Sequence, residues 1–332
     1  MTGGLPGVAG ANSPFRSEGV MGVVALGLAV LDVVQRVQTP PAWGTKGVAD
    51  SVEITAGGPA TNAAIACAAT GVETTLVTAL GRSPQASLVR AECDRHGVRV
   101  IDLAGRGDAW ELPVASCIVD AEGERTVVST GALATTLALT VEAEAALAAA
   151  RVLLLDGHHP RAAAKAVAVR PASCLAVLDA GSAKPHAEEW LPWLDVVAGS
   201  ADYAAGLARL PGAHASEGED ATGHDTARLL QRALDHVLAA GAGAVVMTDG
   251  AAPVHWATRE GERASHTPTQ VRAVDTLGAG DAWHGAFAAA LAHDLSLPQA
   301  IAYACNAAST RVAHEGARTW LGHMPPLSRP SL

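Results

Sequence analysis

The chain has 332 residues, of which 49% are hydrophobic and 34 are glycine, a composition that suits a large buried core and excludes disorder for most of the chain. Its formal net charge of −10, without any cluster of lysine and arginine, argues against a nucleic-acid-binding protein. The sequence contains no run of about 18 uncharged apolar residues, so we expect no membrane-spanning helix.

The N-terminal segment and the cysteines indicate the setting of the folded domain. Residues 1–20 are rich in Gly, Pro and Ser without an apolar period, so we expect a disordered extension. They lack the basic segment and apolar stretch of a secretion signal. The five cysteines are scattered and form no C-x-x-C pair, which favours free thiols and a cytoplasmic protein. The folded domain is expected over residues 21–326.

Apolar strands and helices alternate along most of the chain. Residues 21–30 (MGVVALGLAV) form a continuous apolar run, typical of a strand buried on both faces. Similar runs occur at residues 74–80, 152–155, 175–178, 196–198 and 244–248. Helix-like stretches lie between them, at residues 60–70, 84–96, 141–150, 161–169, 226–240 and 282–293. This alternation predicts a mostly parallel central sheet with helices on both faces, a three-layer α/β/α sandwich.

Two segments interrupt that alternation. Residues 32–55 and about 110–130 contain shorter stretches in which apolar and polar residues alternate, such as VADSVEIT and PVASCIVDAEGERTVVST. Such alternation is typical of strands with one face exposed. We expect these segments to form a small β-sheet that lies as a lid over the α/β body.

The most informative motif is DTLGAGD, residues 275–281, which an Ala-rich helix follows. We interpret Asp275 and Thr276 as the end of a short strand and the next residues as a tight turn. Small residues there leave backbone N–H groups bare at the positive end of a helix, where phosphate oxygens bind. The turn residues in question are Gly278, Ala279 and Gly280.

Asp281 follows that turn at the start of the helix. A carboxylate beside a phosphate site can accept a proton from an attacking hydroxyl while the N–H groups stabilise the transferred phosphoryl group. The alternative is that the Gly-Ala-Gly turn only begins a helix and that Asp281 caps it. The complete motif favours the catalytic interpretation.

DTLGAGD resembles the D-T-x-G-A-G-D signature of the ribokinase (PfkB) family of carbohydrate kinases, and weaker motifs of that family follow in the expected order over residues 21–325. The resemblance implies a ribokinase-like fold with a lid, ATP and Mg²⁺ as cofactors, and a small sugar as acceptor. It also implies that Asp281 is the general base and that the amides of residues 277–281 form the anion hole.

For the sugar, the resemblance points to the G-G-x-x-x-N element, here Gly57, Gly58 and Asn62, as a contact for hydroxyl groups. Asp32, after the first apolar strand, stands where the family has an Asp or Asn that binds sugar hydroxyls. His158, in the loop after VLLL, is a further substrate candidate. Pro59 stands where ribokinases often carry Lys, which makes ribose a less favoured substrate.

For the nucleotide, the turn Met-Thr-Asp-Gly at residues 247–250 resembles the family's T-x-G element. The resemblance implies phosphate contacts from this turn and from the DTLGAGD motif, and an adenine contact from a late helix. The residues are Thr248, Gly250, Thr276, Gly278, Gly280 and Asn306.

The metal candidates are three aspartates, Asp156, Asp202 and Asp275. The family's N-x-x-E magnesium element is altered here, because Ser200 and Tyr203 stand at its two positions, and Asp202 could supply the carboxylate one residue early. Asp275, together with the turn at Gly316, also corresponds to the family's monovalent-cation site, so K⁺ is a further candidate.

Two other functions remain open from the sequence. A nucleoside kinase of the same fold would need an aromatic clamp for the base, for which Trp43 and Trp110 in the lid segments are candidates. A catalytically silent sugar or nucleotide sensor is the second alternative, which the intact Asp281 disfavours. A dinucleotide oxidoreductase is excluded, because no G-x-G-x-x-G follows the first strand. The exposed face of the lid suggests a homodimer.

Overall fold

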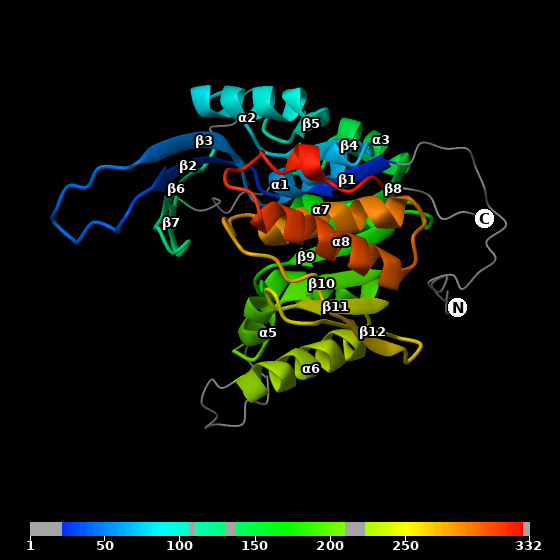
Figure 1. Ribbon diagram of the computed structural model, residues 1–332. Coiled ribbons are helices and arrows are strands. Elements are labelled where there is room, and N and C mark those ends of the chain that lie inside the picture. Colours follow the sequence, from blue (N-terminus) through cyan, green and yellow to red (C-terminus); the bar gives the residue numbers. More distant parts are fainter. Residues whose placement is uncertain (1–21, 106–109, 131–136, 210–222, 328–332) are drawn as a thin grey trace.

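The computed structural model describes residues 22–105, 110–130, 137–209 and 223–327. The expected N-terminal extension lies outside these residues. Within them, one large sheet and one small sheet organise the chain (Figure 1).

The large sheet has nine strands in the order β13-β12-β11-β10-β9-β8-β1-β4-β5. All neighbouring strands are parallel except for β12 and β13, which extend one edge in antiparallel pairing. The strands are β1 (Gly22–Leu26), β4 (Glu73–Thr78), β5 (Val98–Asp102), β8 (Ala150–Leu155), β9 (Leu175–Ala180), β10 (Val196–Ser200), β11 (Ala244–Thr248), β12 (Val254–Thr258) and β13 (Arg263–His266). The central strands are buried along nearly their whole length, as their continuous apolar runs predict.

Helices cover both faces of this sheet, so the predicted three-layer sandwich is confirmed (Figure 1). One face carries α1 (Pro59–Ala69), α7 (Ala279–Ala292) and α8 (Leu297–Val312), with α2 (Pro84–Arg95) beyond the β5 edge. The other face carries α3 (Val141–Ala148), α4 (Pro160–Val169), α5 (Ala201–Leu207), α6 (Gly223–Ala239) and the 3₁₀ segment η1 (Pro185–Trp193). A short 3₁₀ turn, η2 (Leu321–His323), follows α8.

The close contact between α1 and α7 depends on Gly285. A Cβ atom at this position would lie 2.2 Å from the carbonyl oxygen of Ala63, which is nearer than any side chain tolerates. Because α1 and α7 carry Asn62 and Asp281, this packing sets the distance between two candidate site residues.

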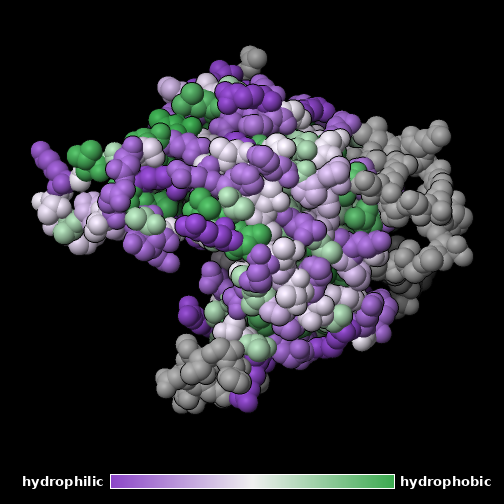
Figure 2. Space-filling view, viewed as in Figure 1, coloured by the Kyte–Doolittle hydropathy of each residue, from purple (hydrophilic) through white to green (hydrophobic). Residues whose placement is uncertain are grey.

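The small sheet projects from one end of the body and overhangs a recess, so we refer to it as the lid (Figures 1 and 2). Its strands are β2 (Val30–Arg36), β3 (Ser51–Gly57), β6 (Val114–Val119) and β7 (Arg125–Ser129), in the order β3-β2-β6-β7. Its inner face packs a small apolar cluster against Leu28 and Leu277, so the lid core includes a residue of the DTLGAGD motif.

Three details of the sequence interpretation are wrong. The first strand ends at Leu26, and residues 30–36 belong to the lid, so Asp32 lies inside a lid strand rather than after a central one. Gly27 directly follows the end of β1. A Cβ atom at Gly27 would lie 2.1 Å from the Asp156 carboxylate, so the carboxylate fills the space that a side chain would need at this strand end. Asp275 and Thr276 are in irregular backbone and not in a strand, because Asp275 bonds to the residues around it. Strands β5, β12 and β13 were not anticipated.

The five cysteines are buried and free. Among the described residues, no helix is both long and apolar enough to cross a membrane.

Candidate active site

A pocket lies where the lid meets α1, the turn before α7 and the segment after α8. It holds about 360 Å³ of space between the atoms, part of which is open solvent. Its wall comes from four separated parts of the chain: Asp32, Thr55, Ala56, Asn62, Leu277, Gly278, Ala282, Arg311, Ala317, Arg318 and Trp320. The structure therefore brings together four residues that the sequence singled out, Asp32, Asn62, Leu277 and Gly278.

Asp32 reaches the pocket because Gly57 has no side chain. Asp32 pairs with Thr55 across β2 and β3, and a Cβ atom at Gly57 would lie 2.0 Å from a carboxylate oxygen of Asp32. Gly58, the N-cap of α1, has φ 92° and passes close to the Leu28 carbonyl, so it also must be glycine. The two glycines thus make room for the carboxylate and for the chain reversal into α1.

Asn62 links the pocket to Asp281. Its Nδ2 atom donates a hydrogen bond of 2.7 Å to the Asp281 carboxylate, and its Oδ1 atom accepts one of 3.0 Å from Arg318. These contacts fix the orientation of the amide, so the two predicted residues on α1 and α7 form one polar group.

The turn before α7 presents backbone N–H groups. Gly278 is the N-cap of α7 with φ 73°, and no side chain caps this helix. The N–H groups of Gly278, Gly280 and Asp281 form no hydrogen bond with another described residue. By contrast, Leu277 donates to Asp275 and Ala279 donates to Thr276. Three amides at a helix N-terminus are therefore available to an anion.

Asp281 is half-buried at that same helix end. Its enclosure by the protein, and then the nearby Asp179 carboxylate, raise the pKa of Asp281 to about 7. The hydrogen bond from Asn62 and the charge of the His284 ring oppose this rise. A carboxylate with a pKa near neutrality is well matched to accept a proton.

Two buried residues lie beneath Asp281. The His284 ring places Nδ1 2.7 Å from the Gly280 carbonyl oxygen and 3.3 Å from the Asp179 carboxylate. Its Nε2 atom lies 3.1 Å from the Ala198 carbonyl oxygen. Oxygen atoms therefore lie within hydrogen-bond distance of both ring nitrogens. Burial raises the pKa of Asp179, and the His284 ring counteracts that rise.

Arg318 and Glu92 form the polar frame behind the pocket. Arg318 donates to Glu92 at 2.8 Å and to the Ala56 carbonyl at 2.6 Å, and Glu92 accepts from the Thr55 hydroxyl and the Ala56 amide. Because its charge is balanced by Glu92, Arg318 adds little net charge to the pocket. Burial raises the pKa of Asp32 to about 6, although the Arg318 guanidinium opposes this rise. Sequence reasoning missed both Arg318 and Glu92.

The three metal candidates are not brought together, and the described residues contain no cluster of His, Cys, Asp and Glu suited to a metal ion. Asp156 accepts hydrogen bonds from the amides of Leu28, Ala60 and His158. Burial opposes its ionisation, but the His158 ring and these amides outweigh burial and hold the pKa of Asp156 below its ordinary range. Asp202 is exposed on α5. These carboxylates do not fit a shared Mg²⁺ site.

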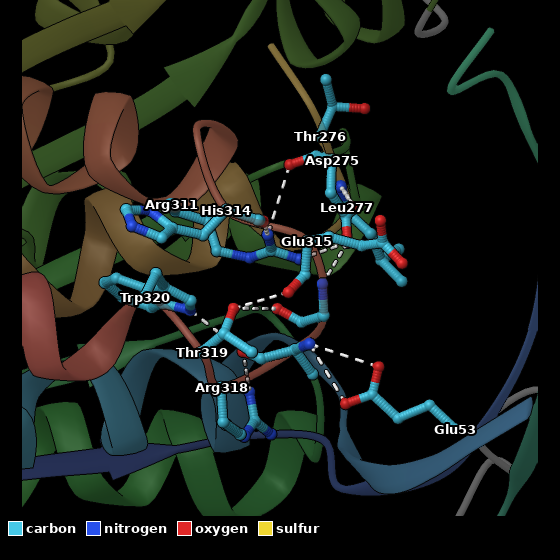
Figure 3. A network of polar contacts seen from close by, with 12 residues as sticks. Glu53, Asp275, Thr276, Leu277, Arg311, His314, Glu315, Arg318, Thr319 and Trp320 are labelled. Carbon is cyan, nitrogen blue, oxygen red and sulfur yellow. Dashed lines mark hydrogen bonds and ion pairs between the residues drawn. The ribbon is translucent and has the colours of Figure 1, made fainter. Parts of the chain in front are cut away.

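Asp275 is also paired within the chain. It accepts hydrogen bonds from Arg36 and from the amides of Leu277 and Gly316, and its carboxylate lies 3.3 Å from Arg311 (Figure 3). Burial would raise its pKa, but these partners, Arg311 first, hold the pKa of Asp275 below its ordinary value. Asp275 therefore supports the turn and is not available to a metal ion.

Four of the nucleotide candidates do not line the pocket. Thr248 ends β11 and donates to the Gly199 carbonyl, and Gly250 follows it with φ 53°. The Thr276 hydroxyl accepts a hydrogen bond from Arg125 of the lid. Asn306 is exposed on α8. None of these four lines the pocket.

The remaining substrate candidates do not reach the pocket. The His158 ring is held by Asp156 at 3.0 Å. Trp43 is fully exposed in the loop between β2 and β3, and Trp110 is buried against the His159 ring. Neither tryptophan forms the aromatic clamp that a nucleoside base would require.

The comparisons with known proteins agree with this architecture. A protein-family model described as pfkB family carbohydrate kinase matches residues 21–322. Ribokinase from Thermotoga maritima has 21% identity and a TM-score of 0.75, covering 93% of this chain and 96% of its own. Ribokinase from Arabidopsis thaliana, in complex with ribose and ATP, has 20% identity and a TM-score of 0.73, covering 92% and 96%. Ribokinase from Cryptococcus neoformans in complex with ADP has 21% identity and a TM-score of 0.69, covering 94% and 98%. At these identities the likeness to solved structures shows a shared fold.

Proposed function

The chain belongs to the pfkB family of carbohydrate kinases, and we propose that it transfers the γ-phosphoryl group of ATP to a hydroxyl group of a small sugar. The observation that carries the proposal is the position of Asp281: a carboxyl with a pKa of about 7 lies beside three available amides and contacts a pocket residue, Asn62. A general base and an anion site at one helix end are the two groups that phosphoryl transfer requires.

In the proposed reaction, Asp281 accepts the proton of the attacking sugar hydroxyl. The hydroxyl oxygen forms a bond to the γ-phosphorus, and the bond from that phosphorus to the bridging oxygen breaks, so that its electron pair leaves with ADP. The amides of Gly278, Gly280 and Asp281 donate to the phosphoryl oxygens as they gain charge. Asp32, for which Gly57 leaves space, and the Asn62 amide, which Arg318 holds, orient the sugar hydroxyls.

Mg²⁺ would neutralise phosphate charge when it accompanies ATP. Asp156, Asp202 and Asp275 are separated or paired within the chain, so they do not form a shared site for this ion. We propose Thr248, Gly250 and Asn306 as contacts for the nucleotide.

A neutral sugar is the acceptor class that the pocket favours. Arg318 is balanced by Glu92, and Arg311 faces Asp275, so neither guanidinium is left to pair with an anionic substrate group. Carboxylate and amide groups at Asp32 and Asn62 suit the adjacent hydroxyls of a sugar.

We further propose that the chain forms a homodimer through the lid. Val52, Ile54, Val127 and Val128 are between 49% and 68% exposed on β3 and β7, and Figure 2 shows apolar side chains at the lid end of the molecule. Light scattering tests this proposal, because Ile54→Lys should convert a dimer to a monomer. The five free thiols are in keeping with a cytoplasmic setting.

The test is direct measurement of ADP release over a panel of pentoses, aldohexoses, ketohexoses and nucleosides. We expect one sugar to stimulate ADP release far above the rate without acceptor, and mass spectrometry of the product should identify a sugar phosphate. A phosphorylated nucleoside as the sole product would favour a nucleoside kinase. Nucleotide or sugar binding without any turnover would favour a sensor and overturn the proposed reaction.

A further inference from the structure

A buried arginine occupies the position where the resemblance to the family predicts a monovalent cation. Arg311, on α8, is 2% exposed and points into the space between residues 275 and 314–316 (Figure 3). Its Nη1 atom donates to the carbonyl oxygens of His314 at 2.9 Å and of Asp275 at 3.3 Å. Its Nη2 atom lies 3.3 Å from the Asp275 carboxylate. The guanidinium is thus surrounded by oxygen atoms.

These atoms do not fit an additional K⁺ ion. Carbonyl and carboxylate oxygens are the ligands that hard cations use, but here they already bind a fixed positive charge. Arg36 brings a second guanidinium to the same Asp275 carboxylate. Gly316 presents its N–H group, at 3.1 Å from that carboxylate, and an amide hydrogen repels a cation. The expected contribution of Asp275 and Gly316 to a K⁺ site is therefore contradicted by their own hydrogen bonds.

The same cluster holds the turn that presents the anion-binding amides. Asp275 accepts the Leu277 amide at 3.0 Å, and the Asp275 and Val274 amides bond to the Val312 carbonyl at the end of α8. Arg311 and the neighbouring Leu277 and Gly278 line one pocket. A positive charge at this place fixes the backbone that leads into Gly278 and Asp281.

We propose that Arg311 is an internal cation that replaces a monovalent ion, so that this chain positions its anion-binding turn without K⁺. The inference rests on the proposed kinase function for its role in turnover, but the ion-binding statement concerns the cluster alone. Arg311 is a positioning residue, because it acts through Asp275 and the turn.

The first experiment varies the salt on the wild-type protein. ADP affinity is measured by calorimetry, and turnover by ADP release, in KCl, NaCl and tetramethylammonium chloride at equal ionic strength of about 100 mM. We expect the three salts to differ by less than about twofold, because an ion that is not bound shifts no equilibrium. A rise of more than about fivefold in ADP affinity or turnover with K⁺ would overturn the inference.

The second experiment compares Arg311→Ala with Arg170→Met. Arg170, the C-cap of α4, is a matched control, because it also donates to two carbonyls and one carboxylate and does not line the pocket. We expect Arg311→Ala to lower ADP affinity or turnover by at least about tenfold. Adding K⁺ or methylguanidinium should restore part of the lost affinity or turnover. Arg170→Met should respond to neither ion. An Arg311→Ala protein with wild-type values in every salt would also overturn the inference.

The two proposals fail separately. If no acceptor supports turnover, the kinase proposal fails. The inference about Arg311 is then still decided by how the ADP affinity and the unfolding temperature of the wild-type protein depend on the salt. If Arg311→Ala does not fold, the wild-type salt series decides it.

Discussion

Asp275 and Asp281 are six residues apart in one motif, and their carboxylates have opposite environments. Asp275 is 2% exposed and bound by two guanidinium groups and two amides, which lower its pKa. Asp281 is half-buried with one amide donor, and its pKa is raised to about 7. Because its pKa is lowered, ionised Asp275 stabilises the fold at pH values above its ordinary pKa. This stabilisation is lost as the pH falls and the carboxylate is protonated. The raised pKa means that ionised Asp281 destabilises the fold as the pH rises through about 7. One motif thus contains a carboxylate that the fold binds and a carboxylate that the proposed reaction uses.

The largest expected effect comes from removing the base. Asp281→Asn keeps the shape of the side chain but cannot accept a proton, so we expect turnover to fall by roughly 10²–10⁴-fold. ADP affinity should change little, because the amides remain. Asp94→Asn, an exposed aspartate on α2, serves as the control in the same ADP-release assay. Near-normal turnover of Asp281→Asn would exclude Asp281 as the base.

Asp275→Asn should act on stability instead. It leaves Arg36 and the buried Arg311 without their carboxylate, and breaking a buried pair in this way costs roughly 3 kcal/mol of unfolding free energy. Urea denaturation followed by circular dichroism measures this difference against Asp94→Asn. An unchanged unfolding midpoint would mean that the Asp275 cluster does not stabilise the turn.

The pH dependence of kcat/KM tests the environment of Asp281. The base is active when ionised, so kcat/KM should level off above about pH 7 and fall about tenfold per pH unit below it. Below about pH 6, protonation of Asp32 should make the fall steeper. Direct ADP measurement avoids coupling enzymes with a pH dependence of their own. A flat profile through this range contradicts the raised pKa of Asp281.

The smallest expected effect is a gain in stability. Asp281→Asn removes a carboxylate that is unfavourable when ionised, so the protein should become more stable at pH 8. Because solvent screens the partly exposed Asp281, we expect a gain of only about 1 kcal/mol in unfolding free energy. The gain should shrink at pH 5, where the wild-type carboxyl is protonated in the folded state. Thermal unfolding at the two pH values measures it, and a loss of stability at pH 8 is the contrary result.

The sequence predicted those parts of the site that local patterns encode. Gly278 and Asp281 follow from a turn-and-helix motif, and Asn62 follows from paired glycines before a helix. Arg318 and Glu92 could not be found in this way, because they are 226 positions apart and meet only in the folded chain. Asp156 and Asp275 were interpreted as metal candidates, since a sequence does not show that backbone amides or guanidinium groups already bind a carboxylate.

The same limit applies to the fold. Continuous apolar runs predicted the buried parallel strands, because both faces of those strands are covered. The antiparallel edge strands β12 and β13 were missed. β13 is largely exposed, so it has no continuous apolar run.

Leu277 has its backbone in the turn before α7 and its side chain in the hydrophobic core of the lid. Arg125 adds a second tie, from β7 to the hydroxyl of Thr276. A hinge movement of the small sheet would therefore displace the backbone of this turn, or else remove the Leu277 side chain from its apolar neighbours. In the proposed reaction, closure of the lid over the sugar and alignment of the phosphate are therefore linked through Leu277 and Arg125.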